Sequence, residues 1–122
     1  MGDVVKMLDE KLRYLSHEIV DDTLFIQIAS ERLSVICPFC NMPSTKLHSL
    51  YQRTFHDLPI QGKNVVYVIN NRKMFCHHAQ CHRKKFAEQF SFLPYKAKKS
   101  TRLEQEIMKI AKNVSSLVAE KY

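Results

Sequence analysis

The sequence predicts an α+β fold: a small, zinc-ribbon-like antiparallel β domain with a short N-terminal helix and a C-terminal helical segment. Three observations lead to this prediction. Two close cysteine pairs, Cys37/Cys40 and Cys76/Cys81, have the spacing of zinc ligands. The residues between them are rich in β-branched and aromatic side chains, and helical periodicity is confined to the two ends of the chain. A chain of 122 residues with 45% hydrophobic content has room for one modest core.

The first helix is expected over about residues 4–14. Apolar side chains recur there at helical spacings, and Asp3 stands ahead of them as a cap for the free amides of the first turn. These apolar residues are Val4, Leu8, Leu12 and Leu15. A strand pair over residues 19–28 is expected next, because an apolar pair and an alternating stretch flank Asp21-Asp22. We expect this hairpin to turn at the two aspartates.

The central part of the chain is predicted to be a second pair of strands. Residues 47–55 look extended, and a turn is expected within residues 58–63, which contain a proline and one of only two glycines. Residues 65–69 form the most β-prone segment of the chain and lead towards Phe75 and the second cysteine pair. Strands are therefore expected to deliver both cysteine pairs.

The C-terminal part is predicted to be helical. The lysine-rich residues 96–99 are expected to be a linker. Thr101 and Glu104 have the spacing of a capping box, which indicates the start of a helix. A stripe expected to be buried follows, made of Leu103, Ile107, Ile110, Ala111 and Val114. Ser115 or Ser116 is expected to cap a third short helix. We therefore expect a zinc-binding β domain over residues 1–95, and a linker with the first helices of a truncated helix-turn-helix over residues 96–122.

The two cysteine pairs are predicted to bind one structural Zn²⁺ ion. Each of the pairs, Cys37/Cys40 and Cys76/Cys81, places two sulfurs on a tight turn, and two such turns facing each other build the tetrahedral site that zinc prefers. In a reducing compartment, close pairs of this kind are more often metal ligands than disulfides. Two alternatives stay open: that some of the thiols are free core residues, and that a nearby histidine replaces one of them. The candidate histidines are His77, His78 and His82. A closed four-thiolate sphere leaves no position for an activated water, so the metal is expected to support folding rather than catalysis.

The net charge of +7 is unevenly distributed along the chain. Residues 1–43 carry a charge of −3, residues 44–102 carry +10 and residues 103–122 are neutral. Basic charge gathered beside a predicted metal site is typical of a phosphate-binding surface. The alternative is a solvated basic face without a partner.

Several classes of function are disfavoured by the sequence. No run of about 18 apolar residues suggests a membrane span, and the N-terminus does not have the pattern of a signal peptide, so a cytoplasmic protein is expected. No Ser/His/Asp arrangement, phosphate-binding loop or dinucleotide fingerprint points to an enzyme or a small-molecule substrate. A thiol oxidoreductase using Cys37 and Cys40 would need a βαβ context, which the neighbouring strands argue against.

Five segments make the chain resemble the N-terminal zinc-binding domain of the ISL-three family of bacterial insertion-sequence transposases. They are Cys37-Pro38-Phe39-Cys40, His48-Ser49-Leu50-Tyr51-Gln52-Arg53, Asp57-Leu58-Pro59-Ile60-Gln61-Gly62-Lys63, Arg72-Lys73-Met74-Phe75-Cys76 and Cys81-His82-Arg83-Lys84-Lys85-Phe86-Ala87-Glu88. The resemblance covers about residues 20–122, because Thr101-Arg102-Leu103 and the following helix look like the opening of the helix-turn-helix in that family. It implies that the four cysteines bind zinc and that the chain binds the terminal inverted repeats of an insertion sequence in a bacterial cytoplasm. The catalytic domain of the family has no counterpart in these residues, so a non-catalytic fragment or truncated relative of such a transposase is expected.

Two roles follow from these expectations. In the first, the chain binds double-stranded DNA through phosphate contacts made by Arg53, Lys63, Arg72, Lys73, Arg83, Lys84, Lys85, Lys96, Lys98, Lys99 and Arg102. In the second, it is a protein-interaction module that assembles subunits, by self-association or by docking through aromatic residues. Those aromatic residues are Phe86, Phe90, Phe92 and Tyr95, which are more often core residues in a domain of this size.

Overall fold

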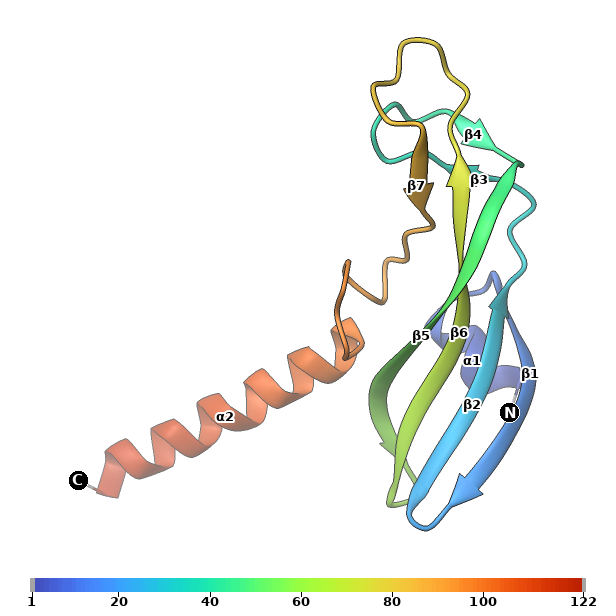
Figure 1. Cartoon of the computed structure of the whole chain (residues 1–122). Coiled ribbons are helices and arrows are strands. Elements are labelled where there is room, and N and C mark those ends of the chain that lie inside the picture. Colours follow the sequence, from blue (N-terminus) through green and yellow to red (C-terminus); the bar gives the residue numbers. More distant parts are fainter. Residues whose placement is uncertain (1, 122) are drawn as a thin grey trace.

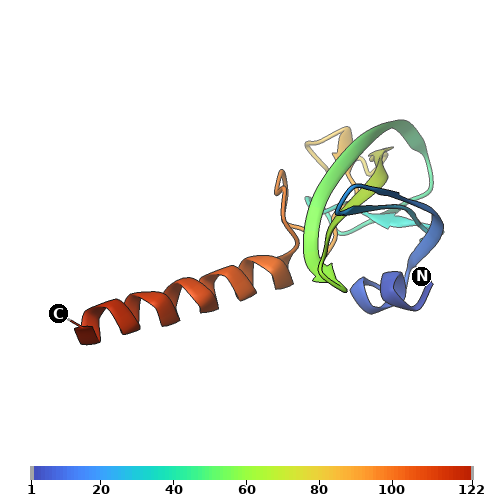
Figure 2. The ribbon, with the colours of Figure 1, turned by 90° about the horizontal axis from the view of Figure 1, so that it is seen from below.

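The computed structural model describes residues 2–121, with side chains described up to residue 112. A mixed β-sheet forms the body of the molecule, a short helix lies against it, and a long helix projects from it (Figures 1 and 2). The elements are α1 (Gly2–Leu8), β1 (Leu12–Val20), β2 (Thr23–Ser30), β3 (Val35–Ile36), β4 (Pro43–Ser44), β5 (Leu47–Ile60), β6 (Lys63–Phe75), β7 (Lys85–Ala87) and α2 (Thr101–Lys121). The predicted α+β class is confirmed.

The main sheet has the strand order β1-β2-β6-β5, and the short β7 pairs with the end of β6. All its pairs are antiparallel, as predicted, except β2 with β6, which run parallel from Thr23↔Asn64 to Ile28↔Ile69. A parallel pair needs a crossover connection, and here the separate β3–β4 hairpin and the whole of β5 lie between the two strands in the chain.

Both long hairpins turn where residues adopt a positive φ. Asp21 has φ 53° in the β1–β2 turn, which confirms the turn predicted at the two aspartates. In the β5–β6 turn, Gln61 and Gly62 have φ values of 50° and 77°, the combination that favours glycine in two-residue hairpins. The observed turn is therefore narrower than the expected range of residues 58–63, since β5 continues to Ile60.

The first helix is shorter than predicted. α1 ends at Leu8, and β1 begins at Leu12, which pairs with Ser30. The side chain of Asp9 accepts a hydrogen bond from the amide of Lys11 at 2.8 Å and so forms the turn between the two elements. The helical spacing that reaches Leu12 and Leu15 misled the prediction because Leu12 belongs to a strand and Leu15 is 44% exposed.

The hydrophobic interior is divided into two clusters. The main core lies between α1, the inner face of the sheet and the segment that follows β7. Its buried residues are Val5, Leu12, Leu24, Ile26, Ile28, Phe55, Val65, Tyr67, Ile69, Phe90, Phe92 and Leu93. The second cluster, called here the zinc-end cluster, contains the buried residues Val35, Cys37, Met74, Cys76 and Phe86, with Cys40 and Cys81 packed against them. Phe90 and Phe92, which the interaction hypothesis required at the surface, are core residues.

The long helix α2 differs from the prediction in three ways. Its N-cap is Ser100 and not Thr101, because the Ser100 hydroxyl accepts a hydrogen bond from the amide of Leu103 at 3.2 Å. It runs to Lys121 without the break expected at Ser115 or Ser116. The stripe expected to be buried is exposed at Ile107 (39%) and Ile110 (56%), because this part of α2 extends away from the sheet (Figures 1 and 2). Val114, the last member of that stripe, lies outside the residues whose side chains are described.

In the part of the chain that the structure describes, neither helix has the length and apolar character needed to cross a membrane.

Candidate metal centre and basic trough

Two loops at one end of the sheet deliver the four cysteines. Cys37 and Cys40 lie in the loop between β3 and β4, and Cys76 and Cys81 lie in the loop between β6 and β7. In the first loop the amide of Asn41 donates to the carbonyl of Cys37 at 2.8 Å, with Asn41 at φ 62°. In the second loop the amide of Cys81 donates to the carbonyl of His78 at 3.0 Å. These local bonds hold each loop as a compact turn, and the sulfurs of one loop lie beside those of the other.

The four sulfurs have the geometry of a tetrahedral zinc site. All of them lie within 4.8 Å of one another, with 3.9 Å between the Sγ atoms of Cys37 and Cys81 and 3.5 Å between those of Cys40 and Cys76. A Zn–S bond length of about 2.3 Å in a tetrahedron corresponds to sulfur–sulfur distances of about 3.8 Å. The residues therefore fit a structural Zn²⁺ ion, as predicted.

Backbone amides point at these sulfurs. Burial alone would raise the pKa of Cys37, but hydrogen bonds from the amides of Phe39 and Cys40 hold it below its usual value. For Cys40, burial and the neighbouring thiols raise the pKa to about 12, although the amide of Met42 acts in the opposite direction. Four thiols so close together cannot all ionise without a cation between them, whereas bound zinc makes each a thiolate.

Cysteine sulfurs alone make up this group. His77, His78 and His82 stand outside it, although they are neighbours in the chain. The free-thiol alternative is also disfavoured, because four unconnected core thiols have no reason to converge from two loops. A site closed by four thiolates has a structural role.

The zinc-end cluster depends on these thiols. Besides two cysteines it has only three buried side chains, namely Val35, Met74 and Phe86. Such a small set buries little apolar surface, whereas the main core has twelve buried residues of its own. The metal is therefore expected to hold the two loops, while the rest of the sheet is held by the main core.

The acidic side chains of residues 44–102 are buried, whereas most of the basic ones are exposed. This segment contains twelve Lys or Arg residues and only two acids, Asp57 and Glu88, and both acidic side chains are 1% exposed. Asp57 binds Arg102 with both oxygens and also accepts from the Ser100 hydroxyl at 2.6 Å. Sequence reasoning missed this burial; the rarity of acids in the segment was the available signal.

Glu88 is the centre of a second polar network. Its carboxylate accepts hydrogen bonds from Arg72 Nε at 2.9 Å, Ser30 Oγ at 2.7 Å and Arg32 Nη1 at 3.3 Å. Arg32 also binds Asp9 at 2.9 Å. The network ties β2 and β6 to Glu88, the residue that follows β7.

The residues predicted to contact DNA fall into three groups. Arg72 and Arg102 bind the two buried acids, and Arg53 donates to the carbonyls of Pro94 and Ala97 at 3.3 and 3.0 Å. Lys63 lies at the β5–β6 turn, at the opposite end of the sheet from the cysteine loops (Figure 1). The remaining seven are exposed: Lys73, Arg83, Lys84, Lys85, Lys96, Lys98 and Lys99. No carboxylate among the described residues forms an ion pair with any of these seven.

Three adjoining hollows form one basic trough beside the metal centre. The middle hollow, of about 350 Å³, shares Tyr51, Arg53 and Lys96 with a hollow that reaches Lys98. It shares Lys73, Ala87 and Tyr95 with another that reaches Phe39 in the first cysteine loop. The basic residues lining the trough are Arg53, Lys73, Arg83, Lys85, Lys96 and Lys98, and no acidic residue lines it.

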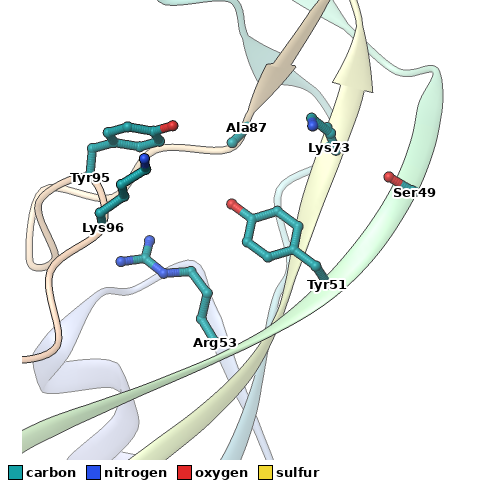
Figure 3. A pocket seen from close by; sticks show the side chains of 7 residues that line it. All are labelled: Ser49, Tyr51, Arg53, Lys73, Ala87, Tyr95 and Lys96. Carbon is teal, nitrogen blue, oxygen red and sulfur yellow. The ribbon is translucent and has the colours of Figure 1, made fainter.

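Two tyrosines lie on opposite sides of the middle hollow (Figure 3). Tyr51 stands on β5 and Tyr95 on the connection to α2, and Tyr95 is 65% exposed. The ammonium of Lys96 lies 5.5 Å from the centre of the Tyr95 ring. Burial raises the pKa of Tyr51, nearby Tyr95 adds to this effect and Arg53 opposes it.

Fold and site together define a small zinc-ribbon-like domain with a four-cysteine metal centre. Residues 34–81 match the family model described as the zinc-finger of transposase IS204/IS1001/IS1096/IS1165. This segment is therefore a zinc-binding domain of that transposase family, and the resemblance noted in the sequence is confirmed for residues 34–81. Comparisons with curated proteins and with solved structures gave no match.

Proposed function

We propose that the chain is a non-catalytic, zinc-dependent DNA-binding module of a transposase, with double-stranded terminal inverted repeats as its target. The observation that carries the proposal is the basic trough, which is lined by six Lys or Arg residues and by no acid. In this proposal the zinc-clamped loops hold one end of the trough in place. The family match to a transposase supports DNA as the polyanion.

The distribution of charge supports phosphate binding in particular. Because Asp57 and Glu88 are buried and bound to arginines, the surface of residues 44–102 presents positive charge and almost no exposed carboxylate. Lysines and arginines of this kind contact the DNA backbone and position a protein without specifying bases. The chain is therefore expected to bind DNA weakly and with a strong dependence on salt.

The division of the chain belongs to the same proposal. Residues 1–95 would form the zinc-binding β domain, and residues 96–122 would connect it to a helix-turn-helix that starts with α2. The connection is pinned to β5, since the amide of His56 donates to the carbonyl of Lys98 and the amide of Ser100 donates to the carbonyl of His56, each at 2.9 Å. Such pinning would give α2 a defined direction relative to the trough.

The proposal is tested by fluorescence anisotropy with a labelled duplex at several salt concentrations. The test variant combines Lys73→Gln, Lys96→Gln and Lys98→Gln, which removes three charges from the trough. Each lost phosphate contact should reduce the slope of log K against log [salt] by about 0.9, so a reduction of about 2 to 3 is expected.

A matched control variant combines Lys11→Gln, Arg13→Gln and Lys46→Gln. It removes the same charge from residues that do not line the trough and should leave the slope close to that of the wild type. Equal slopes for the two variants would show that binding follows net charge alone. No binding by the wild-type chain at low salt would refute the proposal.

The docking form of the assembly alternative has lost most of its structural basis, whereas self-association stays an alternative. It needed an exposed aromatic surface, and Phe86, Phe90 and Phe92 are between 3% and 7% exposed. Tyr95 alone is accessible among the four aromatic residues considered. We therefore retain DNA binding as the proposed function.

A further inference from the structure

The middle hollow of the basic trough combines features that phosphate binding by itself does not require. A duplex backbone needs only positive charge along a surface. Here two aromatic rings, Tyr51 and Tyr95, stand on opposite sides of a hollow whose other polar lining includes Lys73, Lys96 and Ser49 (Figure 3). Exposed rings set among cations are the arrangement by which proteins bind unpaired nucleotides, because bases stack on the rings while cations follow the backbone.

The two walls of this hollow are held at a fixed separation. Tyr51 belongs to β5, where it pairs with Asn71 of the central strand β6. Tyr95 belongs to the connection before α2. Arg53 ties this connection to β5, because its guanidinium donates to the carbonyls of Pro94 and Ala97. Arg53 therefore acts as a positioning residue. The hollow is preformed, so ordering its walls costs little on binding.

Size and chemistry select the occupant. A volume of about 350 Å³ lies at the lower end of the roughly 300–1,000 Å³ found for small-ligand sites, which suits a single nucleotide unit. In an intact duplex the base faces are covered by their neighbours, so the tyrosine rings could not reach them without unstacking. An unpaired nucleotide, as at a frayed or nicked DNA end, presents both a free base face and its phosphates.

We propose that the middle hollow seats one unpaired nucleotide of a DNA strand, with its base against Tyr51 and Tyr95 and its phosphates on Lys73 and Lys96. This inference rests on the proposed DNA-binding function and extends it. The chain would then hold a duplex along the trough and an unpaired nucleotide in the middle hollow.

The test compares three labelled probes by fluorescence anisotropy at fixed low salt: a twelve-nucleotide oligothymidine, a blunt duplex, and the same duplex with a three-nucleotide single-stranded overhang. Four forms of the zinc-loaded chain are used. They are the wild type, Tyr51→Ala/Tyr95→Ala, Tyr51→Phe/Tyr95→Phe and the control Leu50→Ala. Leu50 is 55% exposed on the same strand and does not line the trough. Circular dichroism establishes that each variant is folded.

The expected result is preferential binding of the overhang duplex over the blunt duplex by the wild type. Loss of both rings should weaken binding of oligothymidine and of the overhang at least about fivefold, the lower limit for stacking of one base on an aromatic ring. The phenylalanine variant and Leu50→Ala should bind like the wild type, and binding of the blunt duplex should be unchanged in all four forms.

The other outcomes separate the two proposals. The inference is overturned if the wild type binds the blunt duplex but does not prefer the overhang duplex. It is also overturned if the alanine variant binds the overhang duplex as tightly as the wild type does. In both cases the proposed function stands. An equal loss on all three probes also overturns it, because the tyrosines would then serve binding in general. Oligothymidine binding that depends on the tyrosines, without any duplex binding, would uphold the nucleotide seat and refute duplex recognition. Absence of binding to every probe refutes both.

Discussion

The contact between Asp57 and Arg102 is expected to hold the base of α2 on the sheet, and its two partners should differ in importance. Asp57 is 1% exposed at its side chain, whereas the Arg102 side chain is 34% exposed. Truncating the arginine leaves a buried carboxylate without its cation. Truncating the aspartate releases an arginine that already reaches water.

The magnitudes follow from this asymmetry. Breaking a buried ion pair from one side costs about 3–5 kcal/mol when the remaining charge is buried. Arg102→Ala should therefore lower the free energy of unfolding by about 3 kcal/mol, the low end being chosen because the Ser100 hydroxyl still donates to Asp57. Asp57→Ala should cost about 2 kcal/mol, because the freed guanidinium is hydrated and the main loss is that of charge-assisted hydrogen bonds.

Urea unfolding of the zinc-loaded chain at neutral pH, followed by far-ultraviolet circular dichroism, measures both values; the chain has no tryptophan. The double variant Asp57→Ala/Arg102→Ala should cost less than the sum of the single variants, as expected for partners in contact. A smaller cost for Arg102→Ala than for Asp57→Ala would refute the argument from burial. So would additive costs, since they would mean that the two side chains do not interact.

The same contact predicts a pH dependence. Burial alone would raise the pKa of Asp57, but hydrogen bonds from Arg102 and Ser100 hold it below the ordinary value of 3.8. A lowered folded-state pKa stabilises the fold above the unfolded pKa, and this contribution is lost as the pH falls through the folded pKa. The stability difference between the wild type and Asp57→Asn should therefore be constant near neutrality and shrink below about pH 4. Comparing the two at each pH cancels the effect of acid on the thiolates, and a difference that grew in acid would contradict the assignment.

Three further predictions concern the metal, the second buried acid and a buried hydroxyl. Removal of zinc by a chelator should accelerate hydrogen exchange in the two cysteine loops and leave the main core protected. The reason is that the zinc-end cluster has only three buried side chains besides cysteines. Global unfolding on removal of zinc would show that the two clusters are not independent. Glu88→Gln should lower the free energy of unfolding in urea by about 2 kcal/mol, because Arg72 and Arg32 lose their shared carboxylate, and a change below about 0.5 kcal/mol would contradict this. Tyr67→Phe should be neutral or stabilising by up to about 1 kcal/mol in the same assay, since the buried Tyr67 hydroxyl has no hydrogen-bond partner among the described residues; a loss of 2 kcal/mol would indicate a partner for it.

Much of the fold and of the metal centre could be predicted because their signals are local. Each cysteine pair lies within a single loop, so its spacing reports the geometry of that loop directly. The β1–β2 turn at Asp21 and the β-prone segment of β6 are likewise encoded by neighbouring residues. The start of α2 was predicted to within one residue, but the cap is Ser100 and not Thr101. The Ser100 side chain is held in place by a hydrogen bond to Asp57, which lies on the distant strand β5.

Other features depended on residues far apart in the chain. Helical spacing near the N-terminus predicted a helix that reaches residue 14. The observed helix ends at Leu8, because Leu12 pairs with Ser30 of β2 and belongs to a strand. The apolar stripe of α2 suggested a buried helix, but the described part of it has no core to pack against. A periodic pattern shows which faces of an element are apolar and does not show what will cover them.

By itself, the sequence determined the two cysteine pairs, the two hairpins and the basic character of residues 44–102, since each is a property of neighbouring residues. Only the tertiary structure decided that Asp57 and Glu88 are buried, and that Arg72 and Arg102 bind them. It alone also brought Tyr51 and Tyr95 to opposite sides of one hollow. These arrangements join segments sixteen to forty-five residues apart, and they are selected by the need to pair each buried charge and by the packing of the strands and of the connection before α2 around one core. Neither is expressed in any short stretch of sequence.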